Sequence, residues 1–368
     1  MRRSRSELYS ARMLADERIF VTGFPGFIAS RLLRRLAKEG GHYLLLVQPS
    51  LAERAHAELK NIAADAGKSL SDFAVMEGDI TQPELGLSQR NLERARAETT
   101  TIFHLAAIYD LAVARELAMR VNVEGTRNVN QFALSLPRLS HYHYVSTCYV
   151  AGKRPGIIYE NELRHTAGFR NFYEETKYLA EVAVDQLKSE MPITIHRPSV
   201  VCGDSKTGET VKYDGIYYLI RYILKWPALL STLNIGNSVV SLNLVPVDFV
   251  VNAMAALARD PLAIGQTLQL ADPNPLSTRQ LFNEIARQLA GREAFATVPE
   301  SLVESSLMLS ISPKISGLPH SAVPYFFLKQ TYDTARATQL LAPRGISCPP
   351  FQSYVEAIVD YAARHPVI

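Results

Sequence analysis

The sequence predicts an α/β fold, in which a doubly wound parallel sheet is joined to a smaller, mainly helical C-terminal region. Short apolar runs alternate with helical patterns through the first two thirds of the chain, and this alternation is typical of β-α-β units. The first run passes through a glycine-bearing turn into a helical pattern, and the alternation breaks after Arg197. With 368 residues, 47% of them hydrophobic, the chain can bury the core of such a fold.

Six apolar runs are expected to form the sheet, and they occupy residues 18–22, 43–47, 73–76, 101–105, 142–146 and 193–197. A polar loop at 203–215 then leaves the sheet, and the stretch 239–258 returns to a strand and a helix. An apolar helix over 217–230 is expected to be buried or to face a substrate. A helix within the stretch 277–290 is expected to be opened by Ser277 or Thr278 and closed by Gly291. A last amphipathic helix is expected over 352–364, and residues 292–345 are expected to be irregular.

The glycine-bearing turn TGFPGFIA spans residues 22–29 and has the pattern G-x-x-G-x-x-A. Glycine permits positive φ and lets a pyrophosphate approach the backbone N–H groups at the positive end of a helix. A strand, this turn and a helix in that order predict a dinucleotide site in a Rossmann-type sheet. The residues expected to bind the cofactor here are Thr22, Gly23, Phe24, Pro25, Gly26, Phe27 and Ile28.

Two later strand ends are expected to complete the dinucleotide site. Asp79 follows the third strand, where its carboxylate can accept a hydrogen bond from an adenine amino group, and Ile80 lies beside it. After the fourth strand come Leu105 and the small residues Ala106 and Ala107, which leave room for the cofactor.

The end of the second strand bears on the choice of coenzyme. An acidic residue there would bind the ribose hydroxyl of NAD, whereas a 2′-phosphate favours arginine. Gln48, Pro49 and Ser50 stand at this place, and Arg54 follows within reach. The sequence therefore favours NADP(H) slightly over NAD(H).

A separate constellation predicts carbonyl reduction. Ser146 and Thr147 end the fifth strand, and Tyr173 and Lys177 stand four residues apart, so they share one face of a helix. A phenol with an ordinary pKa of about 10 is a poor acid near neutrality, and a close lysine would lower that pKa. Thr147 would then hold a carbonyl oxygen while Tyr173 gives it a proton.

These motifs resemble the extended short-chain dehydrogenase/reductase family over residues 18 to about 270. TGFPGFIA, GDI, HLAA, NVEGTRNV, VSTCYVAG, Y-x-x-x-K and HRPSVVCGDS stand in the family's order. The resemblance implies a catalytic triad of Thr147, Tyr173 and Lys177, with the lysine also contacting the dinucleotide. It further implies that Asn122 supports the lysine through water, and that Pro198, Ser199 and Val200 lie beside the nicotinamide. Ala29 replaces a third glycine, and Gln48 replaces an arginine.

Within that family, HLAAIYDL, RPSVVCGDSKTGE, KYDGIYY and NLVPVDFVV resemble the fatty acyl-CoA reductases and the terminal thioester reductase domains of carrier-protein enzymes. This branch implies reduction of an acyl thioester, free or bound to a carrier protein, to an aldehyde and sometimes to an alcohol. Apolar residues of the expected lid suit an acyl chain, although ordinary packing also requires such residues: Tyr217, Tyr218, Ile220, Ile223 and Leu224.

Three other functions remain open at this point. A sugar-nucleotide epimerase or dehydratase shares the fold and the triad, and a hydroxysteroid-type dehydrogenase would also use an apolar lid. A protein that senses NADP(H) without reacting is the alternative outside enzymology, but such proteins commonly lose the tyrosine that this chain keeps at Tyr173.

The expected domain organisation follows from the motifs. Residues 1–16 are an N-terminal extension, and 17–204 form the dinucleotide-binding domain, to which 238–272 return. Residues 205–237 and 273–368 form the substrate-binding lid. The family commonly forms dimers, so a homodimer is an expected assembly.

Composition excludes several classes. With 39 basic and 36 acidic residues the net charge is +3, so no global field indicates nucleic acid or an anionic membrane. The N-terminus is basic at first but lacks the apolar run of a signal peptide, and no stretch of about 18 apolar residues indicates a membrane span. Cys148, Cys202 and Cys348 form no C-x-x-C pair, which favours a reducing cytoplasm and no metal site. The histidines in or beside strands are expected to pack there rather than to bind metal: His104, His141, His143 and His196.

Overall fold

The computed structural model describes residues 17–225, 232–294, 296–297, 319–321 and 323–366. The chain divides into two compact units. The first, called here the sheet unit, comprises the chain up to Val150, Phe172–Arg197 and Val251–Leu268. The second, called the C-terminal unit, comprises Ala151–Asn171, Pro198–Val250 and Gln269–Ile368. The expected extension 1–16 lies outside the described residues, and the division into a dinucleotide-binding domain and a lid stays a prediction.

The sheet has seven strands in the order β11-β7-β5-β4-β1-β2-β3. Its strands are β1 Arg18–Thr22, β2 His42–Val47, β3 Phe73–Glu77, β4 Thr101–His104, β5 His141–Val145, β7 Ile193–Pro198 and β11 Thr267–Leu270. Neighbouring strands pair in parallel, so the predicted doubly wound sheet is confirmed. The strand order reverses between β1 and β4, and such a switch point leaves a crevice at the carboxyl ends of the strands.

One strand of the sheet lies outside the six that the sequence indicated. The four-residue β11 begins in the sheet unit and pairs beside β7 at the edge of the sheet. Its run TLQL is short and carries a polar Gln269, so it lacks the continuous apolar pattern of the other strands.

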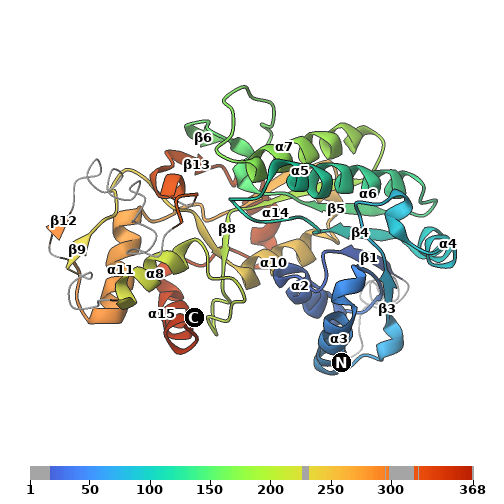
Figure 1. Cartoon of the computed structure of the whole chain (residues 1–368), viewed down its shortest axis with the longest axis horizontal. Helices are drawn as coiled ribbons and strands as arrows, with labels where there is room; N and C mark the ends of the chain where they lie inside the picture. The colour runs from blue at the N-terminus through green and yellow to red at the C-terminus, as the bar shows by residue number, and fades with distance from the viewer. Residues whose placement is uncertain (1–16, 226–231, 295, 298–318, 322, 367–368) are drawn as a thin grey trace. The chain divides into compact units, whose positions relative to one another are not determined.

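Helices cover both faces of the sheet. They are α2 Phe27–Ala37, α3 Ala52–Ala66, α4 Gln89–Glu98, α5 Arg115–Ala118, α6 Gly125–Leu134, α7 Phe172–Asp185 and α10 Val247–Leu257, the last of which begins in the C-terminal unit. In Figure 1, α2 and α3 lie on one side of the sheet, and α6 and α7 lie on the other. A π-helical turn, Met119–Glu124, leads into α6.

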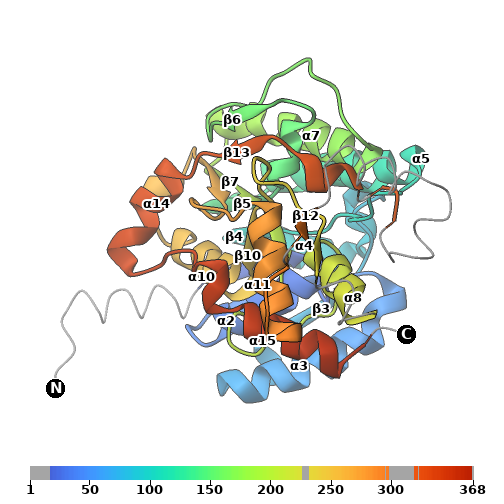
Figure 2. The same cartoon turned by 90° about the vertical axis from the view of Figure 1, so that its left-hand side faces the viewer.

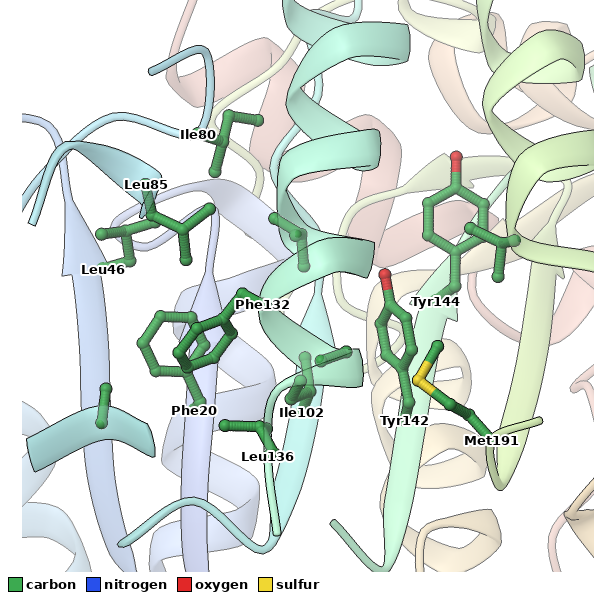
Figure 3. Close-up of a cluster of buried hydrophobic side chains, with 14 of the residues drawn as sticks. Phe20, Leu46, Ile80, Leu85, Ile102, Phe132, Leu136, Tyr142, Tyr144 and Met191 are labelled. Carbon is green, nitrogen blue, oxygen red and sulfur yellow. The ribbon is translucent and has the colours of Figure 1, made fainter. Parts of the chain in front are cut away.

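The core under α6 is apolar and well packed. The rings of Phe20 and Phe132 meet with their centroids 4.8 Å apart, next to Ile102 (Figure 3). Tyr142 and Tyr144 stand on the same face of β5 because they are two residues apart in a strand. This face of β5 therefore carries two buried phenols toward α6 and α7.

The C-terminal unit is mainly helical, with short paired strands. Its helices are α8 Ile216–Lys225, α11 Thr278–Ala290, α14 Ala335–Leu341 and α15 Val355–Arg364, and its strands are β6 Gly156–Ile158, β8 Val200–Cys202, β9 Leu233–Asn234, β10 Leu244–Pro246, β12 Ala296–Thr297 and β13 Gln330–Tyr332. The expected bounds of α11 are confirmed, because Ser277 forms a capping box with Gln280 and Gly291 ends the helix in the left-handed region.

The expectation of irregular structure over 292–345 is wrong for its described C-terminal part. Strand β13 pairs in parallel with β6, and the helix α14 follows it. The buried Glu160 explains this order, because its carboxylate accepts hydrogen bonds from the backbone N–H groups of Gln269, Arg336 and Ala337. The side chain of Glu160, far away in the sequence, thus holds the start of α14 in place.

The apolar side chains of α8 serve mainly to pack the C-terminal unit. Tyr217, Ile220 and Ile223 are buried in a cluster with residues of α11 and α15, which lie close to α8 in Figure 2. Tyr218 and Leu224 are half-buried. Packing accounts for the three buried side chains, so they give no support to an acyl site. The rest of the expected helix, 226–230, lies outside the described residues.

Candidate active site

The turn after β1 requires glycine at two positions for reasons of the chain's own packing. Gly23 has φ of +89°, and a Cβ there would lie 2.8 Å from the backbone nitrogen of Ala106. The N–H of Gly26 donates to the carbonyl of Gly23 over 2.8 Å, and a Cβ on Gly26 would lie 2.6 Å from that same oxygen. The two glycines thus let the turn pass close to the end of β4.

The start of α2 fits a phosphate group. Gly26 precedes the helix with no side-chain hydrogen bond, and the first turn contains no acidic residue. The N–H groups of the first helical turn have no intrahelical acceptor, and the helix dipole makes this end positive. Gly26 is exposed and Phe27 and Ile28 are half-buried, whereas Phe24 and Pro25 are buried. The exposed backbone at Gly26 is where an anion would meet these donors.

A chain of buried polar groups lies beneath the turn. The hydroxyl oxygen of Thr22 accepts from the N–H of Ala106 over 3.1 Å and pairs with Nδ1 of His104 at 2.7 Å. Nε2 of His104 lies 3.1 Å from the hydroxyl of Thr126, which donates to the carbonyl of Asn122 over 2.6 Å. Since Thr126 uses its hydrogen on Asn122, the consistent tautomer of His104 carries its proton on Nε2.

His104 is an uncharged link in this chain. Burial, with the charge of Lys177 adding to it, lowers the pKa of His104 to about 3. The neutral ring joins Thr22, at the end of β1, to Thr126 in α6. The glycine turn is thereby fixed to the helix layer above the sheet.

The other residues expected near the dinucleotide lie at the carboxyl ends of the strands. Asp79 is half-buried, and one oxygen of its carboxylate accepts from the N–H of Thr81 over 2.8 Å. Ile80 is buried below Gly125, where a Cβ would lie 2.6 Å from the Ile80 side chain. Leu105 and Ala106 are half-buried and Ala107 is exposed.

The position after β2 offers both signs of charge. Gln48 and Arg54 are exposed, and Arg54 stands in the first turn of α3. Glu53 precedes it in that same turn and is also exposed. A 2′-phosphate at this place would therefore meet a carboxylate beside the guanidinium.

Lys177 joins the helix α7 to the end of β5. Its buried ammonium donates to the hydroxyl of Tyr144 and to the carbonyl of Val145, each over 2.9 Å, and lies 4.5 Å from the centre of the Tyr144 ring. Thr147 comes two residues after Val145 and is buried. Its hydroxyl oxygen accepts from the N–H of Tyr149 over 3.2 Å, a contact that does not use the hydroxyl hydrogen.

Tyr173 lies one turn before Lys177 on the same face of α7. Its side chain is 5% exposed, and its ring meets the ring of Tyr109 edge-on with the centroids 5.0 Å apart. Tyr109 belongs to the segment that follows β4. Tyr173, Lys177 and the strand end that leads to Thr147 are thus joined within the sheet unit.

Burial makes the charge of Lys177 sensitive to pH near neutrality. Desolvation lowers its pKa to about 7, against an ordinary value of 10.5, and the nearby carboxylate of Glu181 acts in the opposite direction. A lysine with such a pKa changes its charge in the physiological range.

Asn122 holds two backbone segments with its amide group. Its side-chain oxygen accepts from the N–H of Ile108 over 2.8 Å, and its side-chain nitrogen donates to the hydroxyl of Thr176 over 3.0 Å and to the carbonyl of Ile108 over 3.3 Å. Thr176 directly precedes Lys177. Asn122 thus ties the loop after β4 to α7, and a link to the lysine through water stays a prediction.

Pro198, Ser199 and Val200 belong to the C-terminal unit. There the N–H of Ser199 donates to the carbonyl of Leu270 over 3.1 Å, and its hydroxyl donates to the side chain of Asn243 over 2.7 Å. Their expected place beside a nicotinamide stays a prediction.

Sequence reasoning missed three residues that contact this site. The hydroxyl of Tyr144 accepts from the ammonium of Lys177. Glu181, one helical turn after Lys177, forms a buried ion pair with Arg197. Glu181 continues the four-residue spacing of Tyr173 and Lys177, so the helical pattern carried a signal for it. The contact of Tyr144 depends on how β5 packs against α7, which no local pattern encodes.

The described residues contain no group of three or more side chains arranged to hold a metal ion. The expected packing role of the strand histidines agrees with their contacts: His141 pairs with Thr194 at 2.7 Å, and His143 pairs with His196 at 3.1 Å. Cys148 is buried.

Among the described segments, no helix combines the length and the apolar character that a bilayer crossing needs. A cytoplasmic location and a homodimer stay predictions.

Comparison with known proteins identifies the family. A family model described as male sterility protein, with an NAD-binding domain, matches residues 21–254. The fatty acyl-CoA reductase wat of Drosophila melanogaster is 25% identical over 281 residues, which cover 67% of this chain and 54% of that enzyme. The non-canonical nonribosomal peptide synthetase cpsA of Aspergillus campestris is 26% identical over 271 residues, which cover 68% of this chain and 25% of that synthetase. The chain thus spans about half or less of these curated relatives.

Solved structures agree on the fold. The terminal R domain from the myxalamid PKS-NRPS pathway superposes with a TM-score of 0.80 at 24% identity, covering 95% of this chain and 91% of that domain. A UDP-glucuronic acid 4-epimerase from Bacillus cereus in complex with NAD gives a TM-score of 0.66 at 20% identity, covering 94% and 97%. The family resemblance drawn from the motifs is confirmed. The chain belongs to the male sterility protein family of NAD(P)-binding extended short-chain reductases.

Proposed function

We propose that this protein is an NAD(P)H-dependent reductase of acyl thioesters, and that Thr147, Tyr173 and Lys177 carry the reaction. The observation that carries the proposal is the position of Lys177. Its buried ammonium, one helical turn from Tyr173, donates to the carbonyl of Val145 and so joins the tyrosine helix to the strand end of Thr147.

Each side chain has a chemical role in this proposal. A bound reduced nicotinamide would supply the hydride that adds to the carbonyl carbon. The hydroxyl of Thr147 donates a hydrogen bond to the carbonyl oxygen, and Tyr173 transfers its phenolic proton to that oxygen as negative charge develops. The ammonium of Lys177 stabilises the phenolate that remains.

The reaction balances with one proton taken from water. After the reduction the carbon holds a hydroxyl group and the thioester sulfur. The phenolate of Tyr173 takes the hydroxyl proton back as the carbon–sulfur bond breaks, and the sulfur leaves as a thiol with a proton from water. Each thioester thus gains one hydride and one proton, and ends as an aldehyde and a thiol.

The start of α2 and the ends of β3 and β4 are the proposed dinucleotide site. Uncapped N–H groups at Gly26 would bind the pyrophosphate, and Asp79 would accept from the adenine amino group. Of the two coenzymes we propose NADP(H), because β2 is followed by Gln48 rather than an acid, and Arg54 is exposed nearby. Glu53 beside Arg54 makes this preference a moderate one.

The substrate class rests on the relatives. One is named a fatty acyl-CoA reductase, and a superposable structure is a thiolation-reductase di-domain from an archaeal non-ribosomal peptide synthetase, with a TM-score of 0.75 at 18% identity. An acyl-CoA is a thioester, and the second name joins a reductase to a thiolation domain. We propose that the acyl group arrives as a thioester of coenzyme A or of a carrier protein.

Consumption of NADPH and of NADH tests the proposal with four substrates: a long-chain acyl-CoA, the same acyl group on a carrier protein, the corresponding aldehyde, and a UDP-sugar. We expect thioester-dependent oxidation of the coenzyme, release of one thiol per aldehyde, and faster turnover with NADPH. The preference for NADPH should shrink in Arg54→Ala but persist in Lys60→Ala, an exposed cation later in α3.

Three results would contradict the proposal in different ways. Turnover of the UDP-sugar alone would assign the protein to the epimerase or dehydratase class. Turnover of the aldehyde without the thioester would assign it to the alcohol-forming dehydrogenases. Coenzyme binding without turnover of any of the four would favour a sensing role.

A further inference from the structure

The sheet unit contains a buried ion pair that the proposed reaction does not use. Glu181 and Arg197 are fully buried, with side-chain exposures of 0% and 2%, and one carboxylate oxygen accepts from the guanidinium over 2.6 and 2.8 Å. The other oxygen accepts from the hydroxyl of Ser146. A pair so far from water carries a large desolvation cost, which well-packed apolar residues would avoid.

The three residues lie around the proposed catalytic groups. Glu181 stands one helical turn after Lys177 and two turns after Tyr173, on the same face of α7. Ser146 directly precedes Thr147, and its N–H donates to the carbonyl of His196 over 2.7 Å, next to Arg197. The carboxylate of Glu181 therefore reaches both the strand end of Thr147 and the end of β7.

A further contact holds the same strand ends together. The thiol of Cys148 donates to the carbonyl of Arg197 over 3.2 Å. The residues on both sides of Thr147 are thus bound to the ion pair or to its backbone, and Lys177 binds Val145 on the strand itself. The position of Thr147 relative to α7 is defined by these contacts.

Glu181 is the carboxylate whose charge acts on Lys177. His104 faces it from β4 as a neutral ring, Tyr144 faces it from β5 as a neutral phenol whose pKa burial raises, and the packed π-helical turn presents the uncharged amide of Asn122. On α7 itself the titratable residues about one turn away are Tyr173, the buried Glu174 and Glu181. Of these groups, the carboxylate of Glu181 is the one that opposes the desolvation of the ammonium.

We propose that Glu181 is a positioning residue that keeps Lys177 in its ammonium form and, with Ser146 and Arg197, fixes Thr147 against the helix of Tyr173. The proposal rests on the proposed function, since it assigns Glu181 a task within the same triad. Arg197 balances the carboxylate, so that a single buried negative charge is not left in the core.

Three variants separate this role from a purely structural one. Glu181→Gln removes the carboxylate that balances the charge of Arg197. The double variant Glu181→Gln with Arg197→Met removes both buried charges and keeps similar volumes, so it should recover the folding stability that the single variant loses. Glu175→Gln is the matched control, because Glu175 lies on the same helix and pairs with Arg115 over 2.9 Å at the surface.

The readouts are the midpoint of thermal unfolding, the pH dependence of coenzyme affinity, and the pH dependence of kcat. For the double variant we expect a wild-type midpoint, but a loss of coenzyme affinity and kcat that begins at lower pH than in wild type. The shift should be smaller than the ~1–2 pH units expected for the loss of one nearby opposite charge, because removal of the Arg197 cation offsets part of it. Glu175→Gln should match wild type in all three. If Glu181→Gln fails to fold, the double variant still distinguishes a positioning role of Glu181 from a purely structural one.

Recovery of the wild-type pH profile together with stability in the double variant would overturn the inference and make the pair a structural element only. Failure of the proposed function looks different. A wild-type protein that reduces no thioester refutes that function, whereas the pH dependence of coenzyme binding still tests Glu181.

Discussion

Replacing Tyr144 with phenylalanine should lower the activity near neutral pH and leave it intact in mild acid. The hydroxyl of Tyr144 accepts from Lys177 over 2.9 Å, while the ring lies 4.5 Å from the ammonium and is kept in the variant. The change therefore removes one of two hydrogen bonds to a buried cation, together with the hydrogen bond between Tyr144 and Thr126, and leaves the packing almost unchanged.

The magnitude follows from the contact. A hydrogen bond to a charged group contributes ~1.5–3 kcal/mol, and ~1.4 kcal/mol corresponds to one pKa unit, so the pKa of Lys177 should fall by ~1–2 units. From the wild-type value of about 7, the ammonium fraction at pH 7 should then drop from about one half to between roughly a tenth and a hundredth. We expect a loss of kcat of ~5- to 50-fold at pH 7.

The assay is the kcat of thioester reduction measured from pH 5 to 9. Tyr142→Phe is the matched control, because Tyr142 stands on the same face of β5 but donates to Asn130 over 2.9 Å instead. The control should keep the wild-type profile with a small loss of stability. An unshifted profile in Tyr144→Phe, with normal kcat at pH 7, would refute the role given to this hydroxyl.

Three further predictions follow from the same contacts. Burial lowers the pKa of Lys177 to about 7 from 10.5, so between these pH values the unfolded chain binds more protons than the folded chain, and this lysine makes stability rise with pH. Lys177→Met should therefore abolish turnover yet raise the midpoint of thermal unfolding, most below pH 7 and least near pH 10. A midpoint lowered equally at all pH values would contradict this expectation. His104→Leu removes one of the hydrogen-bond partners from each of the hydroxyls of Thr22 and Thr126. We therefore expect ~1–3 kcal/mol of lost stability in denaturant titrations and weaker coenzyme binding, with partial recovery in His104→Gln. Gly23→Ala should cost ~1–3 kcal/mol or prevent folding, since the position has φ of +89° and its Cβ would lie 2.8 Å from the nitrogen of Ala106; a wild-type unfolding curve would show that the turn has room to relax.

Much of the fold could be predicted because its signals are local. The bounds of β1 follow from one apolar run, and those of α11 follow from the capping box at Ser277 and the left-handed Gly291. The turn at Gly23 could be read as glycine-dependent for the same reason. The structure adds that Gly23 must lack a Cβ because the backbone that follows β4, distant in the sequence, passes close to it.

The rest of the site depends on contacts between distant segments. The pairing of Lys177 with Tyr144 and of Glu181 with Arg197 requires α7 to lie across the ends of β5 and β7, and no periodicity encodes that crossing. The amide of Asn122, in the π-helical turn, likewise binds Ile108 and Thr176, which are distant from it in the sequence. Strand β11 was not predicted because its four residues include a glutamine and are too few to show the apolar pattern of a strand.

The most direct test of the central claim is turnover by Tyr173→Phe, with coenzyme affinity measured on the same preparation. The variant keeps the ring and its edge-on contact with Tyr109 and removes the phenolic proton. We expect coenzyme affinity within about twofold of wild type and a loss of kcat of at least ~100-fold, the usual range for a missing general acid. A kcat near wild type would remove Tyr173 from the mechanism and contradict the account.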